Sequence, residues 1–235
     1  LYIDANITGF LNVLEYCRKY NVKNLIYASW SSVYGNNKEL PFFEDQKTDT
    51  PVSVYGVSKK VNELLAHSYS TLYDLQTIGL RFFTVYGPAG RPDMSMFRFV
   101  KWIIENEEIQ LNGDGEQRRD FTHVNDVVEA NINAMMTNYS GIVVNIGTGV
   151  NYSVNEVASF ISNNTVNIPE RLGEARETLA NIDRANTLLS WQPQITLEDY
   201  FDTNTLIWIT CIDYCDSVVK PFIITTWLLW FLRKF

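Results

Sequence analysis

The sequence predicts an α/β protein built on a largely parallel β-sheet with helices on both faces, and three observations support this fold class. Apolar runs typical of strands alternate along the chain with segments of helical periodicity, as in parallel strands joined by crossover helices. Two of these runs, at 24–29 and 141–147, have the character of core strands, as a sheet covered on both faces requires. The composition, with 46% hydrophobic and 20% charged residues in a chain of 235, is that of a globular protein.

In the first part of the chain the pattern predicts a helix, a strand and a second helix. The first helix runs from about residue 4 to residue 20, and its apolar positions recur at helical spacing: Ile7, Leu11, Leu14 and Cys17. The strand at 24–29 follows, and after it comes a turn-rich stretch at 35–51. In the next helix four apolar side chains share one face: Val61, Leu64, Leu65 and Leu72.

The later elements follow from the same signals. QTIGLRFFT at 76–84 predicts a strand. Apolar runs and turns then predict, in order, a helix around Phe97, Val100 and Ile104, a short strand near Ile109, a strand at 118–123, a helix at 124–137 and a strand at 141–147. Ser153 and Glu156 form a capping-box pattern, so a helix should begin directly after Ser153.

Charge and cysteine content limit the classes of function. A formal net charge of −8 argues against nonspecific binding to nucleic acid. Three cysteines without the spacing of a zinc site or a disulfide framework favour a reducing compartment, so we expect a cytoplasmic protein with free thiols. His67 and His123 lack a neighbouring ligand pattern, and we expect no metal site.

The two ends of the chain are unusual. It begins with Leu1 and no secretory leader follows, which is typical of a fragment. Three of the six Trp lie beyond about residue 202, where the apolar stretch FIITTWLLWFL spans 222–232. That stretch is shorter than the about 20 residues that a membrane helix needs. We therefore expect a buried or interfacial segment and no membrane anchor.

Tyr55 and Lys59 are one helical turn apart, so the ammonium is close enough to act on the phenol directly or through a shared ligand. Alone the pair is a weak signal, because surface pairs of this kind arise readily by chance in a chain with 13 Tyr. It lies, however, between two strands that end in ASWSSVYG at 28–35 and RFFTVYGP at 81–88. Strand ends are where doubly wound sheets bind ligands.

These residues belong to a series of segments that resembles the extended short-chain dehydrogenase/reductases that modify nucleotide sugars, and within them the UDP-glucuronate 4-epimerases. The resemblance covers roughly residues 1–200, and its segments occur in the family's order: NITGFLNVLEYCRKYNVKNLIYAS, SSVYG, PVSVYGVSKKVNELLAHSYS, LRFFTVYGPAGRPDM, GDGEQRRDFTHVNDVVEA, NIGTG and NIDRANTLLSWQP. Their joint occurrence is far more specific than the tyrosine and lysine alone.

The resemblance implies the C-terminal part of a Rossmann-like doubly wound parallel sheet with a smaller α/β substrate-binding subdomain. Residues 1–90 would form a partial NAD-binding domain without its glycine-loop half. Residues 91–202 would form mainly the nucleotide-sugar subdomain, with returning elements of the sheet, and residues 203–235 an atypical apolar tail. The implied assembly is a homodimer through the helices near 4–20 and 56–73.

The activity that the resemblance implies is NAD-dependent epimerisation at C4 of a UDP-sugar, UDP-glucuronate to UDP-galacturonate, through a transient 4-keto intermediate. Tyr55 would be the general base, and Lys59 would bind the nicotinamide ribose and lower the pKa of the phenol. Bringing that pKa from about 10 to about 7 takes ~4 kcal/mol of preferential phenolate stabilisation, which Lys59 and the positive nicotinamide ring would supply together. Asn6 would support the cofactor pocket.

Further positions match residues that contact the substrate in the family. Thr84 and Arg91 match positions that recognise the sugar carboxylate, and a guanidinium suits this role because it can hold both carboxylate oxygens. Arg119 matches the arginine that holds the UDP diphosphate, whereas Arg118 would be its solvated neighbour. The NIGTG segment at 145–149 is interpreted as a backbone turn and not as the dinucleotide loop.

The sequence departs from the family at two places that matter for catalysis. Nothing in the chain fits G-x-x-G-x-x-G or G-x-G-x-x-G, so we expect the isolated chain to bind NAD weakly or not at all. Trp30 stands where the family has the Ser or Thr whose hydroxyl bonds the sugar oxygen at the reacting carbon. Because side chains alternate along a strand, Ser29 and Ser31 should face away from the side that Trp30 faces, and Ser32 is displaced by two residues.

Two functions from different classes remain open. One is an NAD-dependent nucleotide-sugar epimerase, favoured by the tyrosine, lysine and arginines named above. The other is a catalytically inactive relative that at most binds a UDP-sugar or a partner subunit, favoured by Trp30 and by the missing glycine loop. A 4,6-dehydratase is disfavoured, because that branch has Asp and Glu where this chain has Ser31 and Ser32.

Removal of the residues after 202 tests the break in composition. We expect the shortened chain to be more soluble, because an apolar tail outside the native core promotes association. Light scattering and thermal unfolding of both chains would measure the effect. A shortened chain that aggregates more, or melts at a lower temperature, would show that the tail completes the core.

Overall fold

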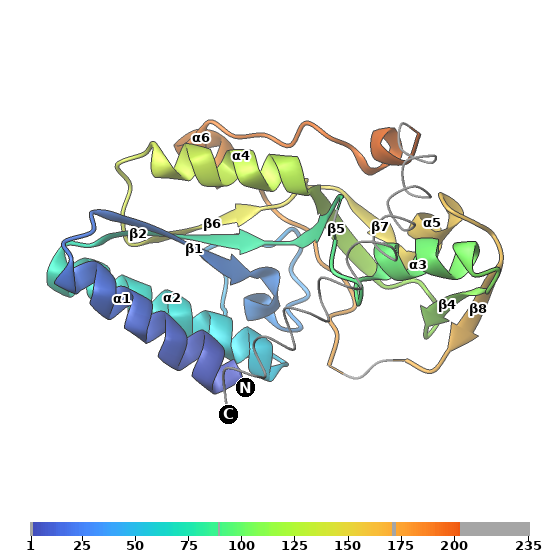
Figure 1. Cartoon of the computed structure of the whole chain (residues 1–235), viewed down its shortest axis with the longest axis horizontal. Helices are drawn as coiled ribbons and strands as arrows, with labels where there is room; N and C mark the ends of the chain where they lie inside the picture. The colour runs from blue at the N-terminus through green and yellow to red at the C-terminus, as the bar shows by residue number, and fades with distance from the viewer. Residues whose placement is uncertain (1, 89, 171–172, 203–235) are drawn as a thin grey trace, which may run out of the picture.

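The computed structural model describes residues 2–88, 90–170 and 173–202, and the expected apolar tail lies outside these ranges. The elements form two groups side by side (Figure 1). One group is a parallel sheet with helices on both faces, and the other is a smaller α/β assembly at the carboxyl ends of the sheet's strands. In the part of the chain described here, no helix is long and apolar enough to cross a membrane.

The first group contains a parallel sheet in the order β1 (Asn24–Trp30), β2 (Gln76–Phe82) and β6 (Ile142–Ile146). In its register Trp30 stands opposite Phe82. The expected strands at 24–29 and 141–147 are therefore present, and the α/β fold class with a parallel sheet is confirmed.

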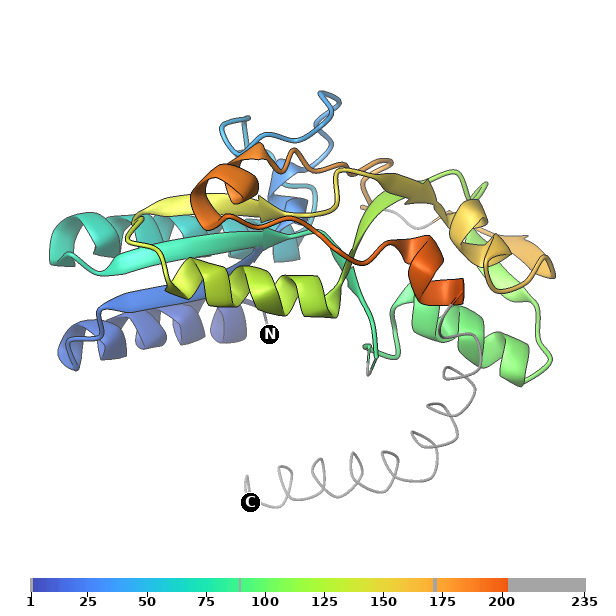
Figure 2. The same ribbon diagram turned by 90° about the horizontal axis from the view of Figure 1, so that it is seen from above.

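Helices cover both faces of this sheet (Figure 1; Figure 2). A short π-helix, η1 (Ile3–Thr8), leads into α1 (Gly9–Lys19), which lies beside α2 (Val54–Tyr73) on one face. On the other face lie α4 (Val124–Met135) and α6 (Asp183–Leu189). The apolar side chains of the sheet pack against α4 and α6 in one buried cluster: Ile78, Leu80, Val127, Ala130, Ala134, Val144, Ile146, Ala185, Leu189 and Trp191.

The smaller group is built from short elements: β3 (Thr84–Tyr86), α3 (Ser95–Ile104), β4 (Ile109–Asn112), β5 (Arg118–His123), β7 (Asn151–Ser153), α5 (Val154–Ser159) and β8 (Thr165–Ile168). β5 pairs with β3 in parallel and with β7 in antiparallel orientation, while β4 pairs with β8. The predicted capping box is present, because Ser153 and Glu156 bond each other's backbone N–H groups at the start of α5.

Two expectations about the elements need correction. The strand predicted at 76–84 is two strands, because the fully buried Phe83 ends β2 and the chain then joins β5 as β3. The apolar face predicted for α2 is also wrong: Leu64 and Leu72 are 56% and 69% exposed. The buried face instead carries mostly small and polar side chains, among them Ser58, Asn62, Glu63 and Ala66.

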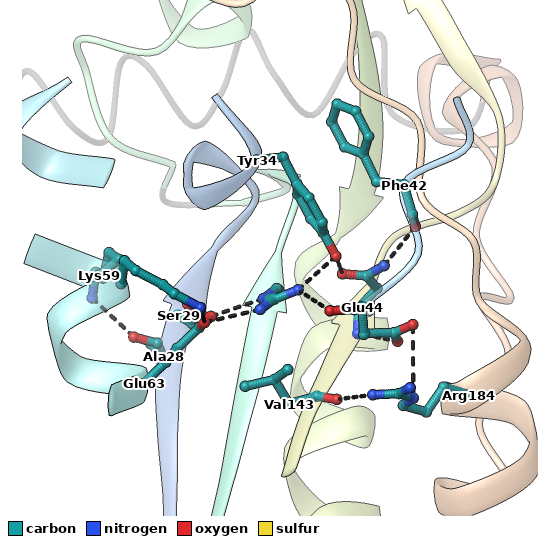
Figure 3. Close-up of polar contacts among 12 residues, drawn as sticks. Ala28, Ser29, Tyr34, Phe42, Glu44, Lys59, Glu63, Val143 and Arg184 are labelled. Carbon is teal, nitrogen blue, oxygen red and sulfur yellow. Dashed lines mark hydrogen bonds and ion pairs between the residues drawn. The ribbon is translucent and has the colours of Figure 1, made fainter. Parts of the chain in front are cut away.

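The buried face of α2 is polar because it carries one half of an ion pair. Glu63 accepts two hydrogen bonds from the buried guanidinium of Arg81 on β2, at 2.8 and 2.9 Å, and one from the Ser29 hydroxyl on β1 at 2.6 Å (Figure 3). Burial acts to raise the pKa of Glu63, but the bonds and charge of Arg81 outweigh it, and the pKa lies below its usual value. A buried ion pair between Glu63 and Arg81 thus joins α2 to β2.

The same guanidinium reaches the loop that follows β1. Arg81 donates to the Tyr34 hydroxyl at 2.8 Å and to the Glu44 carbonyl at 3.0 Å, and Tyr34 in turn donates to Asn145 on β6 at 2.7 Å (Figure 3). The Glu44 carboxylate accepts from the Asn145 backbone N–H at 2.8 Å. Strands β2 and β6 and the loop therefore share one buried polar network.

We expect Glu63→Gln to lower the free energy of unfolding by about 3–5 kcal/mol, because it leaves the buried charge of Arg81 without its partner. The difference from wild type should persist above about pH 4.3, the usual pKa of Glu, and shrink as the pH falls through the lower pKa of folded Glu63. Urea unfolding at neutral and acidic pH measures both effects.

Glu105→Gln is the matched control, since Glu105 belongs to an exposed ion pair with Lys101 and its loss should change stability little. Equal effects of the two substitutions would show that the buried pair has no special role.

Candidate functional site

The site is a cavity of about 410 Å³ between the two groups of elements. The end of β1 contributes Trp30, α2 contributes Tyr55, and β5 contributes Arg119. Much of the opposite wall is α3, which supplies Phe99 and Trp102 among others. The cavity is thus at the carboxyl ends of the parallel strands, as doubly wound sheets place their ligand sites.

Tyr55 lies in the first turn of α2. The helix begins where the Ser53 hydroxyl accepts a hydrogen bond from the Gly56 N–H at 3.0 Å, which satisfies a free N–H of the first turn. One turn later Lys59 donates to the Ala28 carbonyl of β1 at 2.9 Å (Figure 3), and its Nζ is 5.7 Å from the centroid of the Tyr55 ring. The sequence spacing therefore does place the ammonium beside the phenol.

The electrostatics of the pair are set mainly by burial. Burial raises the pKa of Tyr55, and the positive charge of Arg91 opposes it only in part. Burial also lowers the pKa of the Lys59 ammonium. Among the described residues, the environment of Tyr55 thus favours the neutral phenol.

Asn6 positions the helix. Its side-chain N–H donates to the Ser58 hydroxyl at 2.9 Å, and Ser58 donates to the carbonyl of Tyr55 at 2.7 Å. Asn6 is connected to the phenol-bearing residue through the backbone of α2, and we interpret it as a brace for that turn.

Trp30 is half-buried at the end of β1 and lies close to Tyr55, with ring centroids 6.3 Å apart at 71°. The expectation that Ser31 faces away from Trp30 is wrong, because Ser31 and Ser32 line the same cavity. The reason is local: β1 ends at Trp30, a 3₁₀ turn (η2, Ser31–Tyr34) begins at Ser31, and strand alternation no longer applies. Ser29, still in the strand, is buried on Glu63 as expected.

Arg91 and Thr84 lie together in a small pocket beside the main cavity. The Arg91 guanidinium forms a two-bond ion pair with the Asp93 carboxylate, and both side chains are largely exposed. Thr84 and Asp93 also line the main cavity. In this structure the partner of Arg91 is thus a carboxylate of the chain itself.

Arg119 also lines the cavity and is only 17% exposed. It donates to the Arg118 carbonyl at 2.9 Å and is 3.4 Å from the carboxylate of Glu174, and burial lowers its pKa. Arg118 is not a solvated neighbour as expected: it donates to Asn151 at 2.9 Å and pairs with Glu156 at 3.0 Å. These contacts make Arg118 structural, whereas Arg119 lines the cavity together with a second cation, Arg98.

The NIGTG segment forms a turn around a carboxylate of the chain. The backbone N–H groups of Thr148 and Gly149 donate to Asp120 at 2.7 and 3.0 Å, and a Cβ on Gly147 would come within 2.8 Å of the same carboxylate. Its donors are therefore used within the protein, in agreement with the interpretation as a backbone turn.

The aromatic wall from α3 is the part of the site that the sequence motifs did not show. Arg98, Phe99 and Trp102 line the cavity, with the Arg98 guanidinium 4.5 Å above the Trp102 ring. The only signal in the sequence is the helical periodicity of this segment, which indicates a buried face but not what that face contacts.

The fold and the site define a doubly wound α/β protein with a tyrosine and a lysine one helical turn apart at the strand ends. The model of the NAD dependent epimerase/dehydratase family matches residues 1–147. The chain belongs to this family.

Several relatives extend the match beyond residue 147. The chain is 42% identical over 206 residues to a UDP-glucuronate 4-epimerase of Thermodesulfobacterium geofontis, covering 85% of this chain and 63% of the relative. It is similar to the crystal structure of UDP-glucuronic acid 4-epimerase from Bacillus cereus in complex with UDP-glucuronic acid and NAD, with 34% identity and a TM-score of 0.81 over 85% of this chain and 66% of that one.

A third similarity is to UDP-N-acetylglucosamine 4-epimerase from Methanobrevibacter ruminantium in complex with UDP-N-acetylmuramic acid, with 30% identity and a TM-score of 0.81 over 88% of this chain and 69% of that one. The chain spans 63% of the length of the Thermodesulfobacterium relative, less than two thirds of it.

Tyr55 should titrate above about pH 10, the usual pKa of a phenol, and Arg91→Ala should raise its pKa further by removing the charge that opposes burial. Tyrosinate absorbance of the wild type minus that of Tyr55→Phe isolates this phenol, and the same subtraction is made in the Arg91→Ala background. Asp93→Asn is the control, because it keeps the Arg91 charge and should not raise the pKa. A midpoint below pH 10 would contradict the effect of burial.

Proposed function

We propose that this chain acts in the NAD-dependent epimerisation of a UDP-sugar at C4, with UDP-glucuronate and UDP-galacturonate as the two sugars. The observation that carries the proposal is one cavity lined by both Tyr55, on α2, and the buried guanidinium of Arg119, on β5. A nucleotide sugar has the matching chemistry, a hydroxyl-bearing ring joined to a diphosphate. The epimerases similar to this chain support that substrate class.

The donors near Tyr55 suit the nicotinamide end of NAD. Lys59 donates one of its three N–H groups to the Ala28 carbonyl, and the other two could donate to the ribose hydroxyls. In the glycine turn at 147–149, the backbone N–H groups of Thr148 and Gly149 donate to Asp120. This turn is therefore not a pyrophosphate site. The fit therefore concerns the ribose and nicotinamide end, and bound NAD would supply the acceptor and donor of hydride at C4.

Tyr55 would transfer the proton in this reaction. As general base it takes the proton of the sugar 4-hydroxyl, and Lys59 beside it stabilises the phenolate. Because burial alone raises the pKa of Tyr55, the positive charges around it have to supply the opposing effect. Asn6 holds the helix turn that carries Tyr55, through Ser58.

Arg91 would recognise the carboxylate of the uronic acid together with Thr84. The pair with Asp93 supports this, since the guanidinium already presents the two-bond geometry that a carboxylate needs. Arg119 would hold the diphosphate, whose charge exceeds that of the Glu174 carboxylate now beside it.

One observation favours the alternative that this chain binds a nucleotide sugar without catalysing its epimerisation. Trp30 occupies the cavity next to Tyr55. An indole N–H donates a hydrogen bond but accepts none, so it cannot relay the proton of the sugar hydroxyl towards the phenol. Its ring also fills space in which a keto sugar would have to turn over between its two hydride-transfer poses.

We further propose a homodimer through α1 and α2. Both helices expose large apolar side chains on the outer side: Leu11, Val13, Tyr16, Tyr20, Val57, Leu64, Leu72 and Tyr73. A second copy of the same surface would bury them, which is how such patches are commonly covered.

The test joins the glycine-loop segment of a relative to this chain and compares Trp30 with Trp30→Ser. We expect UDP-glucuronate epimerisation to rise about 100-fold or more with serine, because one oriented hydrogen-bonding group is restored and the steric block is removed. Tyr55→Phe in the serine background should abolish the gain, and Tyr139→Phe, at an exposed aromatic outside the cavity, is the control. Strong activity with Trp30 in place would refute the block, and no activity in any variant would refute the epimerase proposal.

A further inference from the structure

We propose that the indole of Trp30 is a stacking platform for the pyranose ring of the nucleotide sugar. At this position the family resemblance implies a catalytic hydroxyl, whereas in this chain the side chain would increase the affinity for the sugar. The proposal rests on the UDP-sugar class proposed above, but it does not require turnover.

The position of Trp30 is held by two aromatic neighbours. Phe82, its partner in the register of β1 and β2, lies 6.3 Å away between ring centroids at 87°, and Tyr55 lies 6.3 Å away at 71°. Both neighbours stand nearly perpendicular to the indole, so neither lies flat against it. Edge-to-face contacts of this kind hold a ring in place, and because Trp30 lines the cavity, part of the indole stays accessible.

The ring is also in the cavity, half-buried and open to a ligand. A volume of about 410 Å³ lies in the range of small-molecule sites, which are lined by apolar and aromatic side chains with a few polar groups that set orientation. A pyranose matches such a surface, because one face presents C–H groups to an aromatic ring while its edge presents hydroxyls.

Polar groups for the sugar edge are present next to the indole. Ser31, Ser32 and Tyr55 line the same cavity. A sugar that stacks on Trp30 would bring hydroxyls to this side of the cavity.

The platform and Arg119 lie in one cavity on different elements, Trp30 at the end of β1 and Arg119 on β5. Anchoring the diphosphate at Arg119 would direct the attached sugar towards β1 and α2. The geometry thus predicts that the sugar ring contributes to binding separately from the nucleotide.

The experiment compares UDP with UDP-glucuronate by calorimetry on the full chain and its Trp30→Ser and Trp30→Phe variants. We expect the wild type to bind the sugar nucleotide about 10-fold tighter than UDP, the size of effect that one good aromatic contact gives. In Trp30→Ser the ratio should fall to about 2-fold or less, whereas Trp30→Phe should keep most of it. Tyr139→Phe, at an exposed aromatic that does not line the cavity, should leave the ratio unchanged.

The outcomes separate this inference from the proposed function. A ratio that is the same in the wild type and Trp30→Ser would overturn the platform while the UDP site stands, and Arg119→Ala should then still weaken both ligands. If UDP binds to no variant, the nucleotide site is refuted, and methyl glucuronide followed by tryptophan fluorescence decides on the platform alone. A fluorescence change in the wild type that is lost in Trp30→Ser supports it, and no change overturns it.

Discussion

The buried ion pair between Arg81 and Glu63 is the constraint on which the rest of the arrangement depends. Taking two charges out of water costs several kcal/mol for each ion, so every oxygen and nitrogen of the pair needs a partner at a set position. Those partners come from β1, from β2 and from the loop after β1. The pair thereby fixes how α2 lies on the sheet, and Tyr55 and Lys59 reach the strand ends because they lie on the same helix.

The sequence predicts the sheet correctly but not the buried face of α2, and the ion pair explains that error. Strand and helix alternation predicts a parallel sheet because covered strands are mainly apolar, and β1, β2 and β6 are so except for their buried polar residues, among them Ser29, Arg81 and Asn145. Periodicity misplaces the buried face of α2, since a face that carries Glu63 and Asn62 has a polar pattern while Leu64 and Leu72 face outward. The break at Phe83 is also invisible in the sequence, because no Gly, Pro or other turn residue separates β2 from β3.

For the site, local motifs carry the information that is local in the structure. The spacing of Tyr55 and Lys59 needs only one helix turn, so the sequence places the two correctly beside each other. Contacts between distant segments escape it: nothing in the sequence pairs Trp102 with the cavity of Tyr55. Ser31 was misplaced for another reason, because rules for strand faces stop at the residue where the strand stops.

The pair of Arg91 and Asp93 has a consequence for any acid that enters the site. Asp93 is a competitor tethered two residues away, and a group held on so short a tether acts at an effective concentration in roughly the millimolar range. To displace Asp93 from Arg91, a free carboxylate of similar affinity has to be present at a concentration above this effective concentration. A carboxylate already anchored through a diphosphate is itself tethered, so it meets Asp93 on equal terms. Because both side chains are largely exposed, the ion pair is weak, and a tethered carboxylate could replace Asp93 on Arg91 at little cost.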